Sequence, residues 1–256
     1  MKLPSVATLF SVVLLSACGG GETSPTASFS TLNVLGSGEG VARGTTSDGR
    51  QALVYTPGVV DVVAAANSGS SDTLNVSASD FPVVSTSGNA VIRQGTISSG
   101  GYTFNVTALQ DTRVSDAAAV FVEMPAGSAD ISMVTGTAYT NALTTGTYTY
   151  SGTQASAPRT SVSPTATGAF SMTANFGAQT FSYTGTSGSV NVIAAGSLDT
   201  ANGRFATNSA SVSVGGTSYT GTMHGLLHGN AGSATSGIFY TNGSAPSYTG
   251  AFIGAR

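Results

Sequence analysis

The stretch Thr217–Arg256 constrains the fold most, because residue types alternate along it. One set of alternate positions mixes bulky residues with glycines: Tyr219, Gly221, Met223, Gly225, Leu227 and Gly229. The positions between them are Thr220, Thr222, His224, Leu226 and His228. A period of two predicts a β-strand with two unlike faces. Glycines beside bulky residues favour a curved sheet, so this stretch is predicted to form the closing strands of a small β-barrel.

The composition favours strands and argues against nucleic acid as a partner. The 256 residues include 8 Lys+Arg and 11 Asp+Glu, with a net charge of −3. Val, Thr, Tyr and Phe are well represented, as strands require. Lys2 is the only lysine and the arginines are scattered, whereas binding to phosphates needs clustered basic residues. No nucleic-acid partner is therefore expected.

Residues 1–17 are predicted to be a lipoprotein signal peptide. Lys2 gives a positive start, and Val6–Leu15 is an apolar run too short to span a bilayer. Leu15-Ser16-Ala17-Cys18 matches the lipobox of bacterial lipoproteins, in which the cysteine is the lipidation site. Cys18 is the only cysteine, so an anchor carrying acyl chains such as palmitate explains it better than a disulfide. The alternative is an ordinary secretory signal with an incidental cysteine.

The anchor predicts where the protein lies. Three acyl chains on Cys18 would hold the chain stably on a membrane. Gly19 stands where an aspartate would favour an inner membrane, which points to the outer membrane. Exposure at the cell surface is expected, with a periplasm-facing orientation left open. Residues 18–27 then form a flexible tether rich in Gly, Ser, Thr and Pro.

Residues 28–140 are predicted to form a β-rich first domain. Its candidate strands are Gln51–Tyr55, Leu74–Ala78, Ala90–Ile97, Tyr102–Ala108, Ala118–Glu123 and Ile131–Thr137. Gly100-Gly101 predicts a hairpin turn. Val59–Ala66 fits a strand or a short helix, and periodicity does not decide between them; Asp111–Ala119 likewise leaves one helical turn open. Gly36–Gly40 lacks the spacing of a phosphate-binding loop, so a flexible turn is the better interpretation.

Residues 141–256 are predicted to form an eight-stranded antiparallel barrel. The candidate strands are Thr147–Thr153, Ala169–Phe176, Thr180–Gly185, Val190–Leu198, Arg204–Val214, Ser218–Asn230, Ser236–Tyr240 and Ser247–Gly254. Gln154–Thr167 is predicted to be a longer loop. A barrel of this size is filled by side chains or holds one small ligand.

The two faces of these strands predict which side is inside. Large apolar residues share one parity: Tyr148, Tyr150, Phe170, Met172, Phe176, Phe181, Tyr183, Met223, Leu227 and Phe252. The other parity is rich in Thr and Ser. A membrane-spanning barrel needs an apolar outside. Frequent glycines on the apolar parity and irregular aromatics favour an all-β, soluble barrel with an apolar interior, preceded by a smaller β-rich domain.

The barrel region resembles a known family. The residues that carry the resemblance are Gly203-Arg204-Phe205, Tyr219-Thr220-Gly221, Gly225, Gly229, Gly237-Ile238-Phe239-Tyr240 and Gly250-Ala251-Phe252-Ile253-Gly254. They are similar to the C-terminal barrel of transferrin-binding protein B, whose relatives include factor H binding protein and haem- or haemoglobin-binding surface lipoproteins. Thr173–Gly177 and Thr180–Gly185 also resemble strands of that family. The chain departs from the best-known members in having one handle–barrel unit and a single lysine.

The resemblance implies an outer-membrane or surface lipoprotein with a barrel beside a β-rich handle domain. It further implies a protein or haem-type ligand, which a TonB-dependent receptor would take up. An alternative from the composition is a structural or protective envelope lipoprotein without a solute ligand. A lipoprotein hydrolase is the least supported function, because the sequence has no GxSxG motif and its acids are dispersed.

Few residues stand out as a chemical site. His224 and His228 would share a helix face, but on a strand they lie about 13 Å apart, too far to bind one metal ion. The face comparison places both on the solvated outside, with a haem or metal contact by one of them as the minor alternative. Tyr240 and Tyr248 flank the Thr241–Ser247 loop and are the candidate binding residues, since tyrosine suits interfaces. No cofactor, metal site or enzymatic activity is expected.

Overall fold

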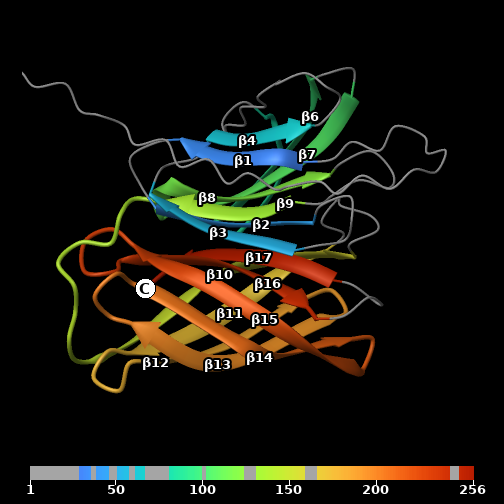
Figure 1. Cartoon of the computed structure of the whole chain (residues 1–256). Helices are drawn as coiled ribbons and strands as arrows, with labels where there is room; N and C mark the ends of the chain where they lie inside the picture. Colours follow the sequence, from blue (N-terminus) through green and yellow to red (C-terminus); the bar gives the residue numbers. More distant parts are fainter. Residues whose placement is uncertain are drawn as a thin grey trace, which may run out of the picture.

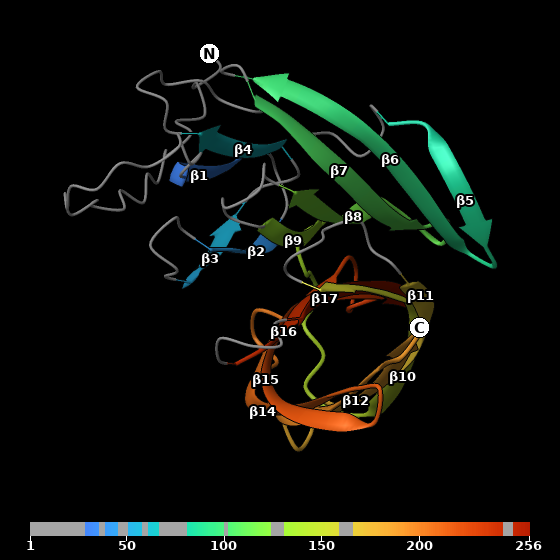
Figure 2. The ribbon, with the colours of Figure 1, turned by 90° about the vertical axis from the view of Figure 1, so that its right-hand side faces the viewer.

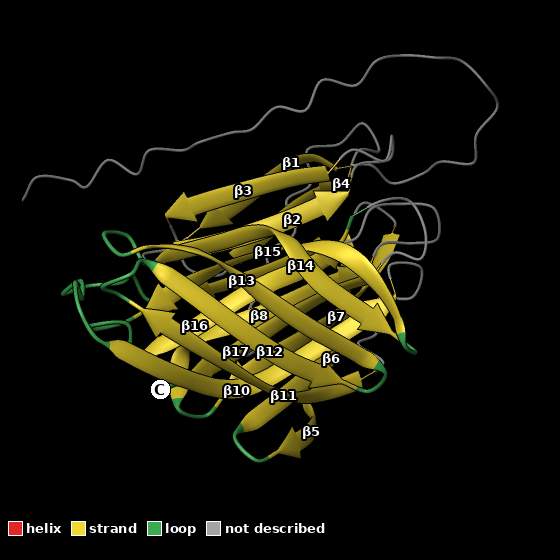
Figure 3. Ribbon diagram, turned by 90° about the horizontal axis from the view of Figure 1, so that it is seen from below, coloured by secondary structure: helices red, strands yellow, loops and turns green. Residues whose placement is uncertain are grey.

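The computed structural model describes residues 29–35, 39–45, 51–57, 61–66, 81–99, 102–123, 131–158, 166–242 and 248–256. Every regular element in these ranges is a β-strand (Figure 3). Among the described residues there is no helix long and apolar enough to cross a membrane. The signal peptide, Cys18, the tether and the predicted strand Leu74–Ala78 lie outside the described residues.

Eight strands close into an antiparallel barrel (Figures 1 and 2). Each pairs with the next along the chain, and the last returns to the first. They are β10 (Thr147–Pro158), β11 (Ala166–Asn175), β12 (Thr180–Ser187), β13 (Val190–Asp199), β14 (Arg204–Val214), β15 (Thr217–His228), β16 (Ala234–Thr241) and β17 (Tyr248–Ala255). The predicted barrel is therefore confirmed.

The predicted loop Gln154–Thr167 is wrong at both ends. Residues 154–158 belong to β10, and Ala166 and Thr167 begin β11. Gln154 continues the alternation of β10: it points inward and is fully buried. Because its side chain is polar, the sequence alone did not indicate that it belongs to the buried face. Its amide is satisfied inside the barrel, where the Tyr183 hydroxyl donates to Gln154 Oε1 over 2.6 Å and Gln154 Nε2 donates to Ser187 Oγ over 2.9 Å. Burial raises the pKa of Tyr183, which keeps this hydroxyl a donor.

The apolar parity fills the barrel interior, as the face comparison predicts. Tyr150, Phe170, Met172 and Tyr183 are buried in one continuous core. The rings of Phe170 and Tyr183 stack at a centroid distance of 5.3 Å, and those of Tyr183 and Phe252 lie 4.6 Å apart. Stacked and tilted aromatic pairs of this kind add to the stability gained by burial. On the other parity of β12, the side chains are exposed.

Glycines inside the barrel make room for these rings. Phenylalanines lie opposite glycines in the register, in the pairs Phe181–Gly196, Phe205–Gly225, Phe252–Gly237 and Phe239–Gly250. A β-carbon added at any of these glycines would collide with the ring of its partner. The curved sheet inferred from the alternating glycines therefore has a physical basis, because each glycine accepts a ring from the neighbouring strand.

The first half of the described chain forms two further sheets. Seven strands, which we call the handle sheet, run in the order β3-β2-β9-β8-β7-β6-β5. They are β2 (Glu39–Thr45), β3 (Gln51–Pro57), β5 (Val83–Ser87), β6 (Ala90–Ser99), β7 (Tyr102–Asp111), β8 (Val114–Glu123) and β9 (Ile131–Gly136). β1 (Phe29–Leu35) and β4 (Asp61–Ala66) pair with each other.

These strands decide the ambiguous predictions in this region. Residues 61–66 of the ambiguous segment Val59–Ala66 are strand. The helical turn left open for Asp111–Ala119 does not form: the chain makes a tight turn between β7 and β8. Asp111 stabilises this turn by accepting a hydrogen bond from the Arg113 backbone N–H over 2.9 Å. Ser99 pairs with Tyr102, which confirms the predicted hairpin.

The handle sheet packs against the outside of β15–β17. Leu226, Ile238 and Ile253 point outward from the barrel and are fully buried. They join Phe121 and Val134 of the handle sheet in a second apolar core. Figure 1 shows the handle sheet lying across this side of the barrel. This contact, which we call the apolar seam, explains why every residue of β16 is buried although only one of its faces can point inward.

Replacing Gly225 with valine is expected to lower the free energy of unfolding by about 3 kcal/mol, because a β-carbon and its two methyl groups would enter space held by the Phe205 ring. Urea denaturation followed by circular dichroism measures the change. Thr220→Val, on an exposed position of the same strand, is the matched control and should change stability by less than about 0.5 kcal/mol. Equal stability of Gly225→Val and the parent would contradict this packing.

Candidate binding groove between the handle sheet and the barrel

The handle sheet extends beyond the apolar seam and overhangs the barrel at β10 and β11. Figure 2 shows the β5–β6 end of the sheet beside β11. Two open cavities of about 370 Å³ and 230 Å³ lie beneath this overhang. Thr167 lines both of them, so they adjoin, and we call the two together the groove. Because the barrel interior is filled by its own side chains, this groove is the described space best suited to a ligand.

The larger cavity is lined by residues of both sheets. The handle sheet contributes Ser87, Gly88, Asn89, Asp111 and Arg113, and the barrel contributes Ser151, Gly152, Thr153, Thr167, Gly168, Ala169 and Phe170. The smaller cavity is lined by Val84, Ser85, Ile92, Gln94, Thr107, Leu109, Ala155, Ala166 and Thr167. Both cavities therefore combine apolar and polar side chains.

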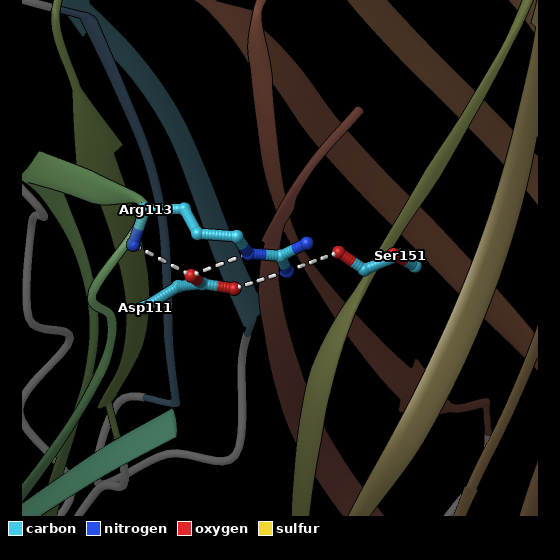
Figure 4. Close-up of polar contacts among 3 residues, drawn as sticks. All are labelled: Asp111, Arg113 and Ser151. Atoms are coloured by element: carbon cyan, nitrogen blue, oxygen red, sulfur yellow. Dashed lines mark hydrogen bonds and ion pairs between the residues drawn. The ribbon is translucent and has the colours of Figure 1, made fainter. Parts of the chain in front are cut away.

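An ion pair lines the larger cavity (Figure 4). Arg113 Nε donates to Asp111 Oδ1 over 2.9 Å, and Arg113 Nη2 donates to Asp111 Oδ2 over 2.6 Å. Nη2 also donates to the backbone oxygen of Ser151 on β10 over 2.7 Å. Arg113 therefore links a turn of the handle sheet directly to the barrel, and its geometry with Asp111 is the strong bidentate form.

The two partners differ in exposure. The Asp111 side chain is 1% exposed and the Arg113 side chain 35% exposed. The hydrogen bond from Arg113 to Asp111 raises the pKa of Arg113, so the guanidinium keeps its charge. The Nε hydrogen and the Nη2 hydrogens of Arg113 are donated to Asp111 and to the Ser151 backbone oxygen. The hydrogens of Nη1 remain available for an acceptor in the groove.

His228 lies in the apolar seam, not on the solvated outside, which corrects the prediction. Its side chain is 0% exposed because the handle sheet covers this part of β15. Nδ1 lies 3.2 Å from the backbone oxygen of Thr137, and Nε2 lies 2.6 Å from Ser236 Oγ. A carbonyl only accepts, so Nδ1 carries a proton, and in the neutral ring the Ser236 hydroxyl donates to Nε2.

His224 lies on the outward face, as predicted, and is partly exposed. Its ring stacks on Tyr240 at a centroid distance of 6.4 Å. In the part of the chain that the structure describes, no three His, Cys, Asp or Glu residues gather closely enough to hold a metal ion. The two histidines have separate surroundings, as their strand spacing requires.

The structure places the two candidate tyrosines on opposite sides of the barrel wall. Tyr240 faces outward and is 8% exposed. Tyr248 is half-buried and packs against the interior core, and its backbone N–H donates to Thr241 Oγ1 over 2.9 Å. A binding role for either tyrosine stays a prediction.

The groove was not predicted from the sequence. Asp111 was one of several dispersed acids and Arg113 one of several scattered arginines. The available signal is local: an acid two residues before an arginine, at a turn between two strands, allows the acid to bind both the backbone and the side chain of that arginine. The contact with Ser151 depends on how the two sheets pack, which no local pattern encodes.

No family model matches the chain, and no curated protein matches it. Among solved structures it is similar to the isotype 1 transferrin-binding protein B from serogroup B Neisseria meningitidis, with a TM-score of 0.55 at 14% identity over 89% of this chain and 44% of that one. Intact transferrin-binding protein B with its N and C lobes gives a TM-score of 0.53 at 14% identity over 88% and 46%.

A mutant of transferrin-binding protein B from Haemophilus parasuis Hp5, a vaccine antigen, gives a TM-score of 0.52 at 12% identity over 88% of this chain and 45% of that one. The chain therefore spans less than half the length of these proteins. At such low identity the likeness shows the fold alone. It confirms the predicted resemblance: the chain has a transferrin-binding protein B-like fold, with a closed eight-stranded barrel beside a β-rich sheet.

Replacing Arg113 with alanine is expected to lower the free energy of unfolding by about 2 kcal/mol, because the buried Asp111 carboxylate loses its guanidinium partner. Urea denaturation provides the measurement. Thr112→Ala, in the middle of the same turn and exposed, should stay within about 0.5 kcal/mol of the parent. The double variant Asp111→Asn/Arg113→Leu should recover part of the loss, since it removes the unpaired charge. Additive losses in that double variant would contradict the pairing.

Proposed function

We propose that this protein is a lipid-anchored outer-membrane lipoprotein, exposed at the cell surface, that binds a protein or small nutrient ligand and has no enzymatic activity. The lipobox at Cys18 and the tether support the anchor. The fold it shares with transferrin-binding protein B supports a binding role. We further propose that residues 28–140 and 141–256 are its two domains.

The observation that best supports binding is the groove between the handle sheet and the barrel. The described barrel interior is packed with aromatic and aliphatic side chains. The groove combines an apolar wall, small polar side chains and an arginine with unused donors. Binding sites usually combine such apolar surface with a few placed polar groups. Tyr240 and Tyr248 are retained as secondary candidates for contact with a partner.

The ligand and its route follow from the same proposal. A protein ligand fits an open groove better than haem does, because His228 is buried and His224 stacks on Tyr240. A TonB-dependent receptor is the proposed acceptor if the ligand is a nutrient. The alternative function is a structural or protective envelope lipoprotein. The Ser- and Thr-rich exposed face of β12 and its neighbours is the observation that favours it.

Replacing Cys18 with alanine should move the protein from the membrane fraction to the soluble fraction, because the thiol that carries the acyl chains is lost. Cell fractionation and immunoblotting measure the shift. Ser16→Ala keeps a small residue in the lipobox and should leave the protein in the membrane. If Cys18→Ala remained membrane-bound, the anchor would have to lie elsewhere. Protease treatment of intact cells then separates surface exposure from a periplasm-facing orientation.

The binding role is tested by incubating cells that carry the full-length protein with host or environmental fluid and identifying retained molecules by mass spectrometry. A ligand that is retained saturably, and is absent from cells lacking the protein, is the expected result. Protease accessibility at the surface without any saturable ligand would instead support the structural or protective role.

A further inference from the structure

We propose that the groove binds an extended, uncharged segment of a partner protein, which lies along β5 and presents a backbone carbonyl oxygen to Arg113. This inference rests on the proposed binding function and specifies its ligand. It follows from four properties of the groove: its course along the strands, the free edge of β5, its small-residue floor and its internal charge balance.

The groove follows the strands in one direction. On β5 its lining passes from Val84 in the smaller cavity to Ser87 in the larger one, and on β10 it passes from Ala155 to Ser151. Four residues of β-strand correspond to about 13 Å. An extended segment of about four residues therefore matches the length of the groove.

β5 is the edge strand of the handle sheet. In the described part of the chain it pairs with β6 on one side and with no strand on the other. All five of its residues are exposed, and none of them carries a charge. Val84, at the groove, is 51% exposed. Free edges are usually protected by charged residues, and an uncharged one is suited to pair with an added strand.

The floor of the groove is made mostly of small side chains. Gly152, Ala155, Ala166 and Ala169 come from β10 and β11, beside serine and threonine, and Phe170 is the one large side chain on the barrel side. Small residues let another backbone approach closely. A flat floor of this kind has no deep socket for a bulky ligand, whereas it accommodates an extended chain whose side chains alternate between the floor and solvent.

The charge balance of the groove favours an uncharged segment. Among the described residues that line the two cavities, Asp111 and Arg113 are the charged ones, and they neutralise each other. The Nη1 hydrogens of Arg113 remain available as donors to a neutral oxygen. A backbone carbonyl meets this requirement, whereas a segment with several charges would find no counter-charge here.

The test uses the purified full-length protein and a phage-displayed library of random peptides of about six residues, the usual length of a strand. Thr167→Trp fills the floor of the groove at a position shared by both cavities. Thr184→Trp is the matched control, because Thr184 is an exposed threonine on β12 and lines neither cavity. Urea denaturation first establishes that both variants are folded.

Selected peptides should be uncharged, and Thr167→Trp should weaken their binding by about tenfold or more, while Thr184→Trp leaves it unchanged. Hydrogen exchange at the amides of Val83–Ser87 should slow when peptide is bound, because an added strand protects the free edge. Two further arms use neutral mono- and disaccharides as probes and sedimentation to detect self-association.

The proposal is overturned if no peptide binds, if Thr167→Trp and Thr184→Trp bind equally well, or if β5 gains no protection. Binding of a saccharide, or a dimer that Thr167→Trp abolishes, would assign the groove to another occupant and also overturns it. The broader binding function fails separately: if cells retain a natural ligand that Thr167→Trp captures as well as the parent, the protein is a binding lipoprotein whose site lies outside this groove.

Discussion

The apolar seam between the handle sheet and β15–β17 is the contact on which the arrangement of the molecule depends. Leu226, Ile238 and Ile253 are fully buried although they point away from the barrel interior. Burying a side chain of this size stabilises a fold by about 1.5–3 kcal/mol, so the three together contribute several kcal/mol. The seam holds the handle sheet in one position over the barrel, and the groove exists because that sheet extends beyond the seam.

Close backbone approach supports the same contact. A β-carbon on Gly136 of β9 would lie 2.6 Å from His228 Nδ1, so the handle strand reaches this histidine only because it carries glycine there. The His228 ring then satisfies its two nitrogens with one group from each side, the Thr137 carbonyl and the Ser236 hydroxyl. Buried polar groups need such partners, and this one has them within the seam.

Alternation along the chain predicted the barrel well. It identified all eight strands and the inward face, because that face must be apolar and its glycines mark where rings enter. Alternation also assigned His228 correctly to the outward face, but it could not show that another sheet covers that face. The isoleucines at 238 and 253 on the same outward face were the available signal of a cover. The order of the handle strands depends on long-range pairing, which no local pattern contains.

The candidate groove also could not be predicted from local sequence patterns. Val84, Arg113 and Ser151 are far apart in the sequence, and each looked ordinary in its local context. They line one space because the two sheets meet at a fixed angle, so the candidate site is a product of packing and not of a motif.

The central claim is that the apolar seam positions the handle sheet on a barrel that is stable in itself. Hydrogen exchange measured on the full-length variant Ile253→Asp tests it directly, because an unpaired carboxylate would be forced into the seam. The account predicts that amides of β8 and β9 lose protection, while those of β12 and β13, on the far side of the barrel, keep theirs. Unchanged protection in β8 and β9 would contradict it.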